Sequence, residues 1–139
     1  MKKLTLVLFS LAVLLIYSCS KDQKAVNNLE GDWKVTSVTI DGVADTADYS
    51  MDKYTFEKCK LSKGDCPGTY TTVDPTKGEV ASSFTYSFED DGETLIMNID
   101  FLGTPITTTG KVIDHTDSKF SWSENGDQGE VIVTELTKA

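Results

Sequence analysis

The sequence predicts one all-β domain, an eight-stranded antiparallel up-and-down barrel that follows an N-terminal signal and a short linker. The chain has 139 residues, which suits one core rather than two. From Gly31 onward, β-branched and aromatic residues alternate with polar ones and no helical periodicity is visible. Gly, Asn and Asp interrupt these runs at short intervals, which favours hairpins between consecutive strands. A meander of this kind can close into a barrel and so remove its exposed edges.

The first 18 residues are typical of a secretion signal. Two lysines precede an apolar run of 14 residues, Leu4 to Tyr17, and a helix needs roughly 20 to cross a bilayer, which argues against a permanent transmembrane anchor. The segment from Ile16 to Cys19 resembles a bacterial lipobox, although Tyr17 departs from the usual small residue. The resemblance implies that Cys19 becomes the first mature residue and carries diacylglycerol on its sulfur. Two or more fatty acyl chains, such as palmitate, anchor a protein stably.

Residues 19–28 are predicted to be the lipidated cysteine and a flexible tether, because 20–28 are polar and aperiodic. The folded domain is expected over 29–139. The chain has 13 lysines and no arginine against 22 acidic residues, and loss of the signal would leave a net charge of −11. Nucleic acid is therefore an unfavourable partner, and the lipid must supply attachment to the membrane. We expect an outer-membrane lipoprotein on the periplasmic or the cell-surface side.

The two cysteines that remain, Cys59 and Cys66, predict a disulfide. Outside the cytoplasm such a pair is normally oxidised, and closing a loop of this length contributes about 2.5 kcal/mol in the chain-entropy model. A metal pair would need further Cys or His ligands nearby, and a redox pair would need Cys-x-x-Cys spacing. The sequence around them offers neither.

The strands follow from alternation and turn residues. Asp91-Gly92 and Asn125-Gly126 favour hairpins, because a type I′ turn needs positive φ at its central residues. We expect strands at 32–40, 52–59, 68–73, 79–88, 93–101, 105–114, 118–123 and 129–136. Because these connections are short, strands that are consecutive in the sequence should pair with each other in the sheet.

Alternation also predicts which face of the sheet is buried. In the expected strand 93–101, one face carries Leu95, Met97, Ile99 and Phe101. Other strands likewise have one apolar and one polar face, so the barrel should be apolar inside and polar outside. A transmembrane pore has the opposite arrangement.

The opening of the first strand, Leu29 to Trp33, resembles the Gly-x-Trp motif of the lipocalins. Here the motif is Gly31 and Trp33, and the resemblance implies that the tryptophan plugs the base of the barrel. Residues 29–137 as a whole resemble the small lipocalin-like lipoproteins of Gram-negative bacteria, and the loop from Asp41 to Met51 resembles the large loop over the lipocalin mouth. The chain lacks the family's late arginine that stacks on the tryptophan, and no helix follows the last strand.

If the first strand starts at the base, alternate loops lie at the mouth, and the inward residues nearest to it form a largely aromatic ring. We expect this ring to be Tyr54, Phe84, Ile99, Phe101, Ile106, Trp122 and Val131. It suits non-covalent binding of a small hydrophobic ligand. The alternative is a barrel filled by its own side chains, since eight strands enclose little more than that. Such a barrel would act as an interaction or accessory module at the envelope.

The sequence gives little support for catalysis or metal binding. His115 is the single histidine and lies beside carboxylates, but it fits a turn at the closed end and no nucleophile accompanies it. The acidic runs 89–93 and 124–130 do not have the spacing of a calcium loop, and solvated turns explain them. Asp45-Thr46-Ala47 resembles a periplasmic O-glycosylation sequon, which an ordinary exposed loop explains equally well. We expect no enzyme activity, no metal and no cofactor.

Overall fold

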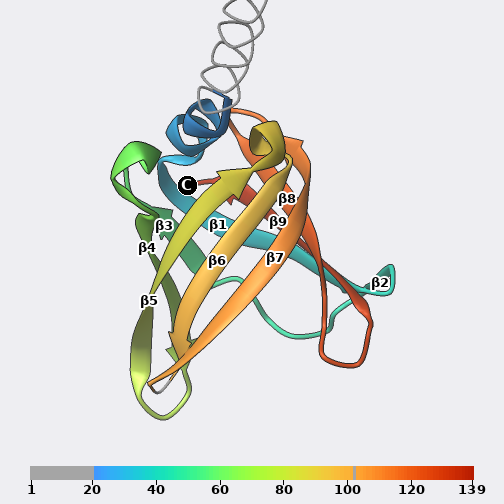
Figure 1. The fold of residues 1–139 in the computed structure, drawn as a ribbon. Coiled ribbons are helices and arrows are strands. Elements are labelled where there is room, and N and C mark those ends of the chain that lie inside the picture. Colours follow the sequence, from blue (N-terminus) through green and yellow to red (C-terminus); the bar gives the residue numbers. More distant parts are fainter. Residues whose placement is uncertain (1–20, 102) are drawn as a thin grey trace, which may run out of the picture.

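The computed structural model describes residues 21–101 and 103–139, so the signal and the lipidation of Cys19 lie outside the described residues. One antiparallel sheet contains the strands, and apart from the short second strand they are arranged in chain order (Figure 1). They are β1 (Gly31–Ile40), β2 (Val43–Ala44), β3 (Lys53–Phe56), β4 (Cys66–Asp74), β5 (Gly78–Glu89), β6 (Thr94–Phe101), β7 (Thr104–His115), β8 (Lys119–Asn125) and β9 (Val131–Lys138). Two short 3-10 turns, η1 (Leu61–Lys63) and η2 (Asp90–Gly92), lie between strands.

The sheet closes into a barrel because β1 pairs with both β3 and β9. The two-residue β2 pairs antiparallel with the end of β1. The other eight strands form the predicted up-and-down barrel. β-bulges follow Val35 in β1 and Val112 in β7, where the register shifts. Bulges bend strands and increase their twist, which helps a sheet to close.

The predicted boundaries match the observed strands to within two residues, except in the second strand. We expected that strand over 52–59, whereas β3 ends at Phe56. The chain then enters the loop that the Cys59–Cys66 disulfide closes, with a Cα–Cα distance of 5.4 Å. The predicted disulfide is therefore confirmed, and it lies at the end of the barrel where β1 begins.

Residues 21–29 form a helix that packs against the base, so the prediction of a flexible tether is wrong for this segment. Ala25, Val26 and Leu29 are buried in the core. Their i, i+1, i+4 spacing gives the helix an apolar face, but the stripe is too short to stand out in a polar segment. The folded part of the chain therefore includes residues that we had placed outside the domain. In the described residues, no helix is long and apolar enough to cross a bilayer.

Hydrogen bonds fix this helix to the loops at the base, beside the C-terminus of the chain (Figure 1). The Gln23 side chain donates to the Cys59 carbonyl and accepts from the Leu61 amide, both at 2.9 Å. Asp22 accepts from the Gly92 amide at 2.7 Å. The helix thus contacts both the disulfide loop and the β5–β6 turn and covers the closed end.

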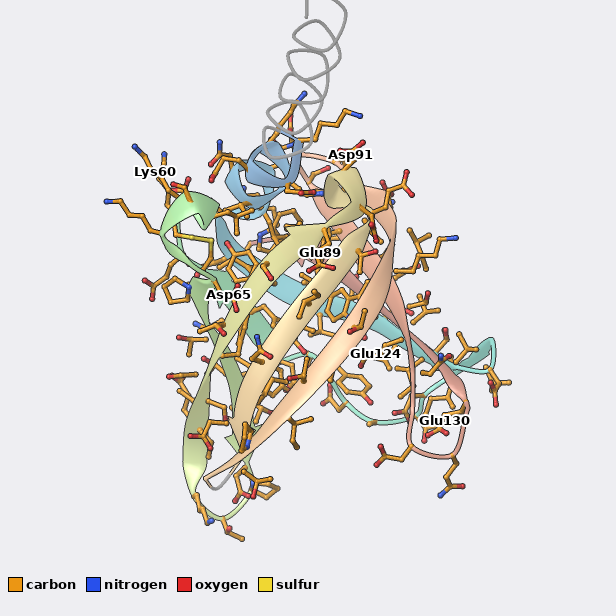
Figure 2. All side chains as sticks on the ribbon, viewed as in Figure 1. Lys60, Asp65, Glu89, Asp91, Glu124 and Glu130 are labelled. Carbon is orange, nitrogen blue, oxygen red and sulfur yellow. A yellow bond between two sulfur atoms is a disulfide. The ribbon has the colours of Figure 1, made fainter. Side chains whose placement is uncertain are left out.

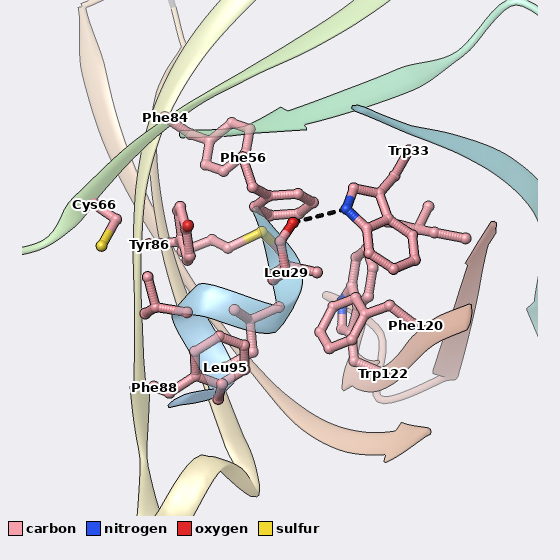
Figure 3. Packing of buried hydrophobic residues seen from close by; sticks show 14 of the residues in the cluster. Leu29, Trp33, Phe56, Cys66, Phe84, Tyr86, Phe88, Leu95, Phe120 and Trp122 are labelled. Atoms are coloured by element: carbon pink, nitrogen blue, oxygen red, sulfur yellow. Dashed lines mark hydrogen bonds between the residues drawn. The ribbon is translucent and has the colours of Figure 1, made fainter. Parts of the chain in front are cut away.

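Trp33 plugs the base, as the resemblance implied. Its side chain is fully buried, and its Nε1 donates to the Leu29 carbonyl at 2.7 Å (Figure 3). Lys138 takes the place of the missing arginine, because its Nζ lies 5.1 Å from the indole centroid and donates to the Glu30 carbonyl. Gly31 permits this approach: it has φ +118°, and a Cβ there would lie 3.3 Å from the Cε of Lys138.

Candidate ligand-binding site

The half of the barrel nearest the helix is filled by side chains. Aromatic rings meet edge to face, with centroids 5.0 Å apart for Phe56 and Tyr86 and 6.4 Å apart for Phe56 and Phe120 (Figure 3). The fully buried side chains are Leu29, Trp33, Phe56, Cys66, Tyr86, Leu95, Phe120 and Leu136, with Val26 and Trp122. This half matches the alternative of a packed core.

The opposite half, which we call the mouth, is open to solvent. Its inward-facing side chains are apolar but incompletely covered: Ile40 is 40% exposed and Ile106 is 44% exposed. Ile106 faces inward because it pairs with Ile99, which alternation places on the same face as the buried Met97. Apolar surface that points into a barrel and remains accessible to water is what a ligand-binding mouth requires.

The structure brings several of the predicted ring residues together. The Tyr54 centroid lies 5.9 Å from that of Phe84 and 5.8 Å from that of Trp122. Ile99 pairs with Phe84 on one side and with Ile106 on the other. Phe84 and Trp122 are buried, whereas Tyr54 and Ile99 are half-buried and lie nearer the solvent.

The remaining two predicted ring residues, Val131 and Phe101, are not placed with the others. Val131 does not face inward: alternation along β9 places the buried Thr134 and Leu136 inside, so Val131 lies on the outer face and is 44% exposed. The sequence pattern misled us because β9 carries apolar residues on both faces and a threonine inside. Ile132 occupies the inward position instead. The side chain of Phe101, the last residue of β6, lies outside the described part of the structure.

Three polar atoms beside this ring were missed by sequence reasoning. Trp122 is only 1% exposed, and its Nε1 lies within hydrogen-bonding reach of the Glu124 carboxyl. The Thr108 hydroxyl is a second donor to the same carboxyl. Thr108 faces inward beside Met97, and Glu124 is labelled on β8 in Figure 2. We call Trp122 Nε1, Thr108 Oγ1 and Glu124 Oε2 the inner polar cluster.

Electrostatic shifts agree with the closeness of these groups. Burial raises the pKa of the Glu124 carboxyl, while hydrogen bonds from the Trp122 indole and the Thr108 hydroxyl lower it. Burial also raises the pKa of Tyr54, and the nearby Tyr70 and Glu124 raise it further. The Tyr54 ring, which packs against Trp122, therefore also lies close enough to the Glu124 carboxyl for its charge to matter.

A second polar group near the mouth is fully paired. Asp52 is buried and accepts hydrogen bonds from the Tyr70 hydroxyl at 2.5 Å and the Thr72 hydroxyl at 2.6 Å. Burial and the bond to Asp52 raise the pKa of Tyr70 to about 12. The Asp52 carbonyl accepts from the Val35 amide at 3.0 Å. This network holds the start of β3 in place.

His115 ends β7 at the base, as the topology predicted. Its ring stacks on Phe88 at 5.7 Å and meets Phe120 edge to face at 4.9 Å. Burial lowers the pKa of His115, and the charges of Asp114 and Asp117 partly oppose this. The imidazole therefore packs against the core, where burial disfavours its charged form.

The acidic turns make contacts within their own loops and, at the base, with the helix. Asp90 accepts from the Thr94 hydroxyl at 2.8 Å, and Asp91 pairs with Lys21 of the helix at 2.9 Å. In the β8–β9 loop, Glu130 accepts from the Gln128 amide at 2.9 Å. The carboxylates of 89–93 thus help to attach the helix at the base.

Comparison with known proteins shows the fold. No family model matches the sequence, and no curated protein matches it. A redesigned β-barrel superposes with a TM-score of 0.58 at 14% identity, over 83% of this chain and 95% of that chain. A redesigned β-barrel bound to DFHBI, mFAP1, gives 0.52 at 15% identity, over 82% and 98%. A lipocalin-like protein from Bacteroides uniformis gives 0.57 at 18% identity, over 81% and 99%. At identities this low the likeness concerns the fold alone, and that fold is a lipocalin-like barrel.

Proposed function

We propose that this protein is a carrier of the cell envelope, tethered by lipid on Cys19, whose barrel binds a small and mainly apolar ligand through its mouth. The observation that carries the proposal is the contrast between the two ends. The base is sealed by the helix and by Trp33, whereas inward apolar side chains at the mouth, such as Ile106, remain accessible. A pocket built in this way binds by burying apolar surface rather than by covalent chemistry.

The structural neighbours are consistent with this proposal. One of the redesigned barrels that share the fold binds DFHBI, so a barrel of this size can hold a small molecule. The packed-core alternative fits the base half, and in that case the barrel would act through its outer surface. The two functions differ in whether the mouth takes up an apolar molecule.

Binding is tested with residues 21–139, which contain the helix, the disulfide and one continuous core. We expect naphthalene to bind in equilibrium dialysis. Ile106→Asp, which places a charge inside the mouth, should weaken binding about tenfold or more. Ile113→Asp is the matched control, because Ile113 lies on the same strand and is 58% exposed. Absence of naphthalene binding, or equal effects of the two variants, would contradict the carrier.

The anchor is tested separately in cells. Metabolic labelling with an alkyne-bearing fatty acid should mark the full chain, and Cys19→Ala should abolish the label. Cys59→Ala with Cys66→Ala is the control, since those sulfurs form the disulfide. A Cys19→Ala protein that still takes up label would rule out the lipid assignment.

A further inference from the structure

The docked helix fixes the place at which the chain leaves the barrel toward Cys19, and that place is the base. Lys21 begins the helix, and its Nζ lies 2.9 Å from a carboxylate oxygen of Asp91 in the β5–β6 turn. Asp22 accepts from the amide of the same turn, and Gln23 bonds to the disulfide loop. The helix, the β5–β6 turn and the disulfide loop therefore surround the exit point, at the end opposite the mouth (Figure 1).

The distance from Cys19 to this exit point is short compared with the length of the barrel. Cys19 precedes Lys21 by two positions, and two residues span at most about 7 Å. β5 runs from Gly78 at the mouth to Glu89 at the base and has 12 residues, which is about 36 Å along the strand. With strands tilted by roughly 40°, the barrel is about 28 Å long. A lipid on Cys19 therefore holds the base, and not the mouth, next to the bilayer.

The charges of the two ends favour the same orientation. Anionic headgroups attract lysines and repel carboxylates within about 8 Å at physiological salt, the Debye length. At the base the helix and the disulfide loop carry several exposed lysines, and Lys60 is labelled in Figure 2. In the described part of the chain, two of these lysines form ion pairs, Lys21 with Asp91 and Lys58 with Glu30. The loops at the mouth carry mainly carboxylates, so an anionic surface opposes contact with the mouth.

The two sets are as follows. The lysines of the helix and the disulfide loop are Lys21, Lys24, Lys58, Lys60 and Lys63, and the base also carries Asp22, Glu57, Asp65, Asp90 and Glu93. The mouth loops and the strand ends beside them carry Asp41, Asp45, Asp48, Asp74, Glu79, Asp100, Asp127 and Glu130, with Lys53 and Lys77.

We infer that the base, formed by the helix, the disulfide loop and the β5–β6 turn, docks on the phospholipid surface that holds the anchor, so that the mouth opens away from that surface. This inference rests on the proposed function, because it takes the lipid on Cys19 from it. It also restricts the route of the ligand. The accessible apolar side chains of the mouth, such as Ile106, face the aqueous compartment, so the barrel exchanges its ligand with that compartment and does not draw it directly from the bilayer beneath its base.

The orientation is tested with the full, lipidated chain in vesicles of phosphatidylethanolamine and phosphatidylglycerol that contain a lipid with a nitroxide on its headgroup. The nitroxide quenches only fluorophores that lie close to the surface. An NBD label is attached to Lys24→Cys at the base or to Lys77→Cys at the mouth, with the Cys59–Cys66 disulfide intact. These substitutions are matched, because both replace an exposed lysine. The separation of the two ends should make quenching at residue 24 about threefold or more stronger than at residue 77.

A second label at the mouth distinguishes an upright barrel from one that lies on its side. Gln128 is exposed in the β8–β9 loop, across the mouth from Lys77 in the β4–β5 turn. We expect NBD on Gln128→Cys to be quenched as weakly as NBD on Lys77→Cys. If either mouth label is quenched as strongly as the base label, the inference is overturned, while the anchor and the carrier stand. If the intact mass of the chain shows no lipid on Cys19, the proposed anchor fails and the inference fails with it.

Discussion

Replacing Gly110 by alanine tests whether the barrel wall is shaped around the Trp122 ring. The added Cβ would lie 2.5 Å from Trp122 Cδ1 and 3.2 Å from Cγ, well inside van der Waals contact. The indole is 1% exposed and also packs against Phe120, with centroids 5.6 Å apart, so it cannot move aside without disturbing its neighbours. Overpacking of this kind costs roughly 1–3 kcal/mol. Alanine also lowers the conformational entropy of the unfolded chain, which offsets about 0.4–1 kcal/mol of this destabilisation.

We therefore expect Gly110→Ala to lower the free energy of unfolding by about 1–2 kcal/mol, measured by urea denaturation with far-UV circular dichroism. Gly126→Ala is the matched control. Its Cβ would meet the Glu130 side chain, with Oε1 at 2.3 Å, Cδ at 2.5 Å and Cγ at 2.9 Å. That side chain can move aside by giving up its hydrogen bond from the Gln128 amide, so the unfolding free energy should fall by less than in Gly110→Ala. Equal midpoints for wild type and Gly110→Ala, or equal effects of the two substitutions, would refute the placement of the indole over Gly110.

Three further perturbations test the base. Leu29→Ala should destabilise residues 21–139 by about 2–5 kcal/mol because Leu29 is fully buried, whereas the exposed Lys24→Ala should be nearly neutral; equal urea midpoints would mean that the helix does not dock. Reducing the Cys59–Cys66 disulfide should lower the unfolding free energy by about 2.5 kcal/mol, and no difference between oxidised and reduced urea midpoints would contradict the constraint. The lowered pKa of His115 means that the unfolded chain binds its proton more readily, so stability should fall as pH drops below about 6.5. His115→Gln should show a smaller loss between pH 7 and pH 5, and equal losses would contradict the buried imidazole.

Most of the barrel could be predicted from the sequence because alternation and turn chemistry act locally. The apolar face of β6 and the Gly31–Trp33 motif were assigned correctly, because the alternation of apolar and polar residues within a strand indicates which of its faces is buried. The docked helix could not be predicted, because its apolar stripe consists of Ala25, Val26 and Leu29 within a polar segment. Its stability comes from tertiary contacts, which local sequence does not encode.

The candidate site was predicted only in part, for a similar reason. The inward positions of Tyr54, Phe84 and Trp122 were predicted from the alternation of apolar and polar residues along their strands. Val131 was placed on the wrong face because both faces of β9 are apolar there. Glu124 escaped notice because charged residues are normally assigned to the outside, and its inward position depends on the pairing of β8 with β9. The Lys138 contact with Trp33 likewise joins the two ends of the barrel sequence.

The most direct test of the account compares the two indole N–H resonances in ¹H–¹⁵N NMR spectra. The chain has two tryptophans: Trp33 plugs the base, where its Nε1 donates to the Leu29 carbonyl, whereas Trp122 lies beside Tyr54 and Glu124 in the ring at the mouth. Titration with naphthalene should shift the Trp122 resonance, while the Trp33 resonance stays in place. An unmoved Trp122 resonance, or equal movement of both, would contradict a ligand-binding mouth above a sealed base.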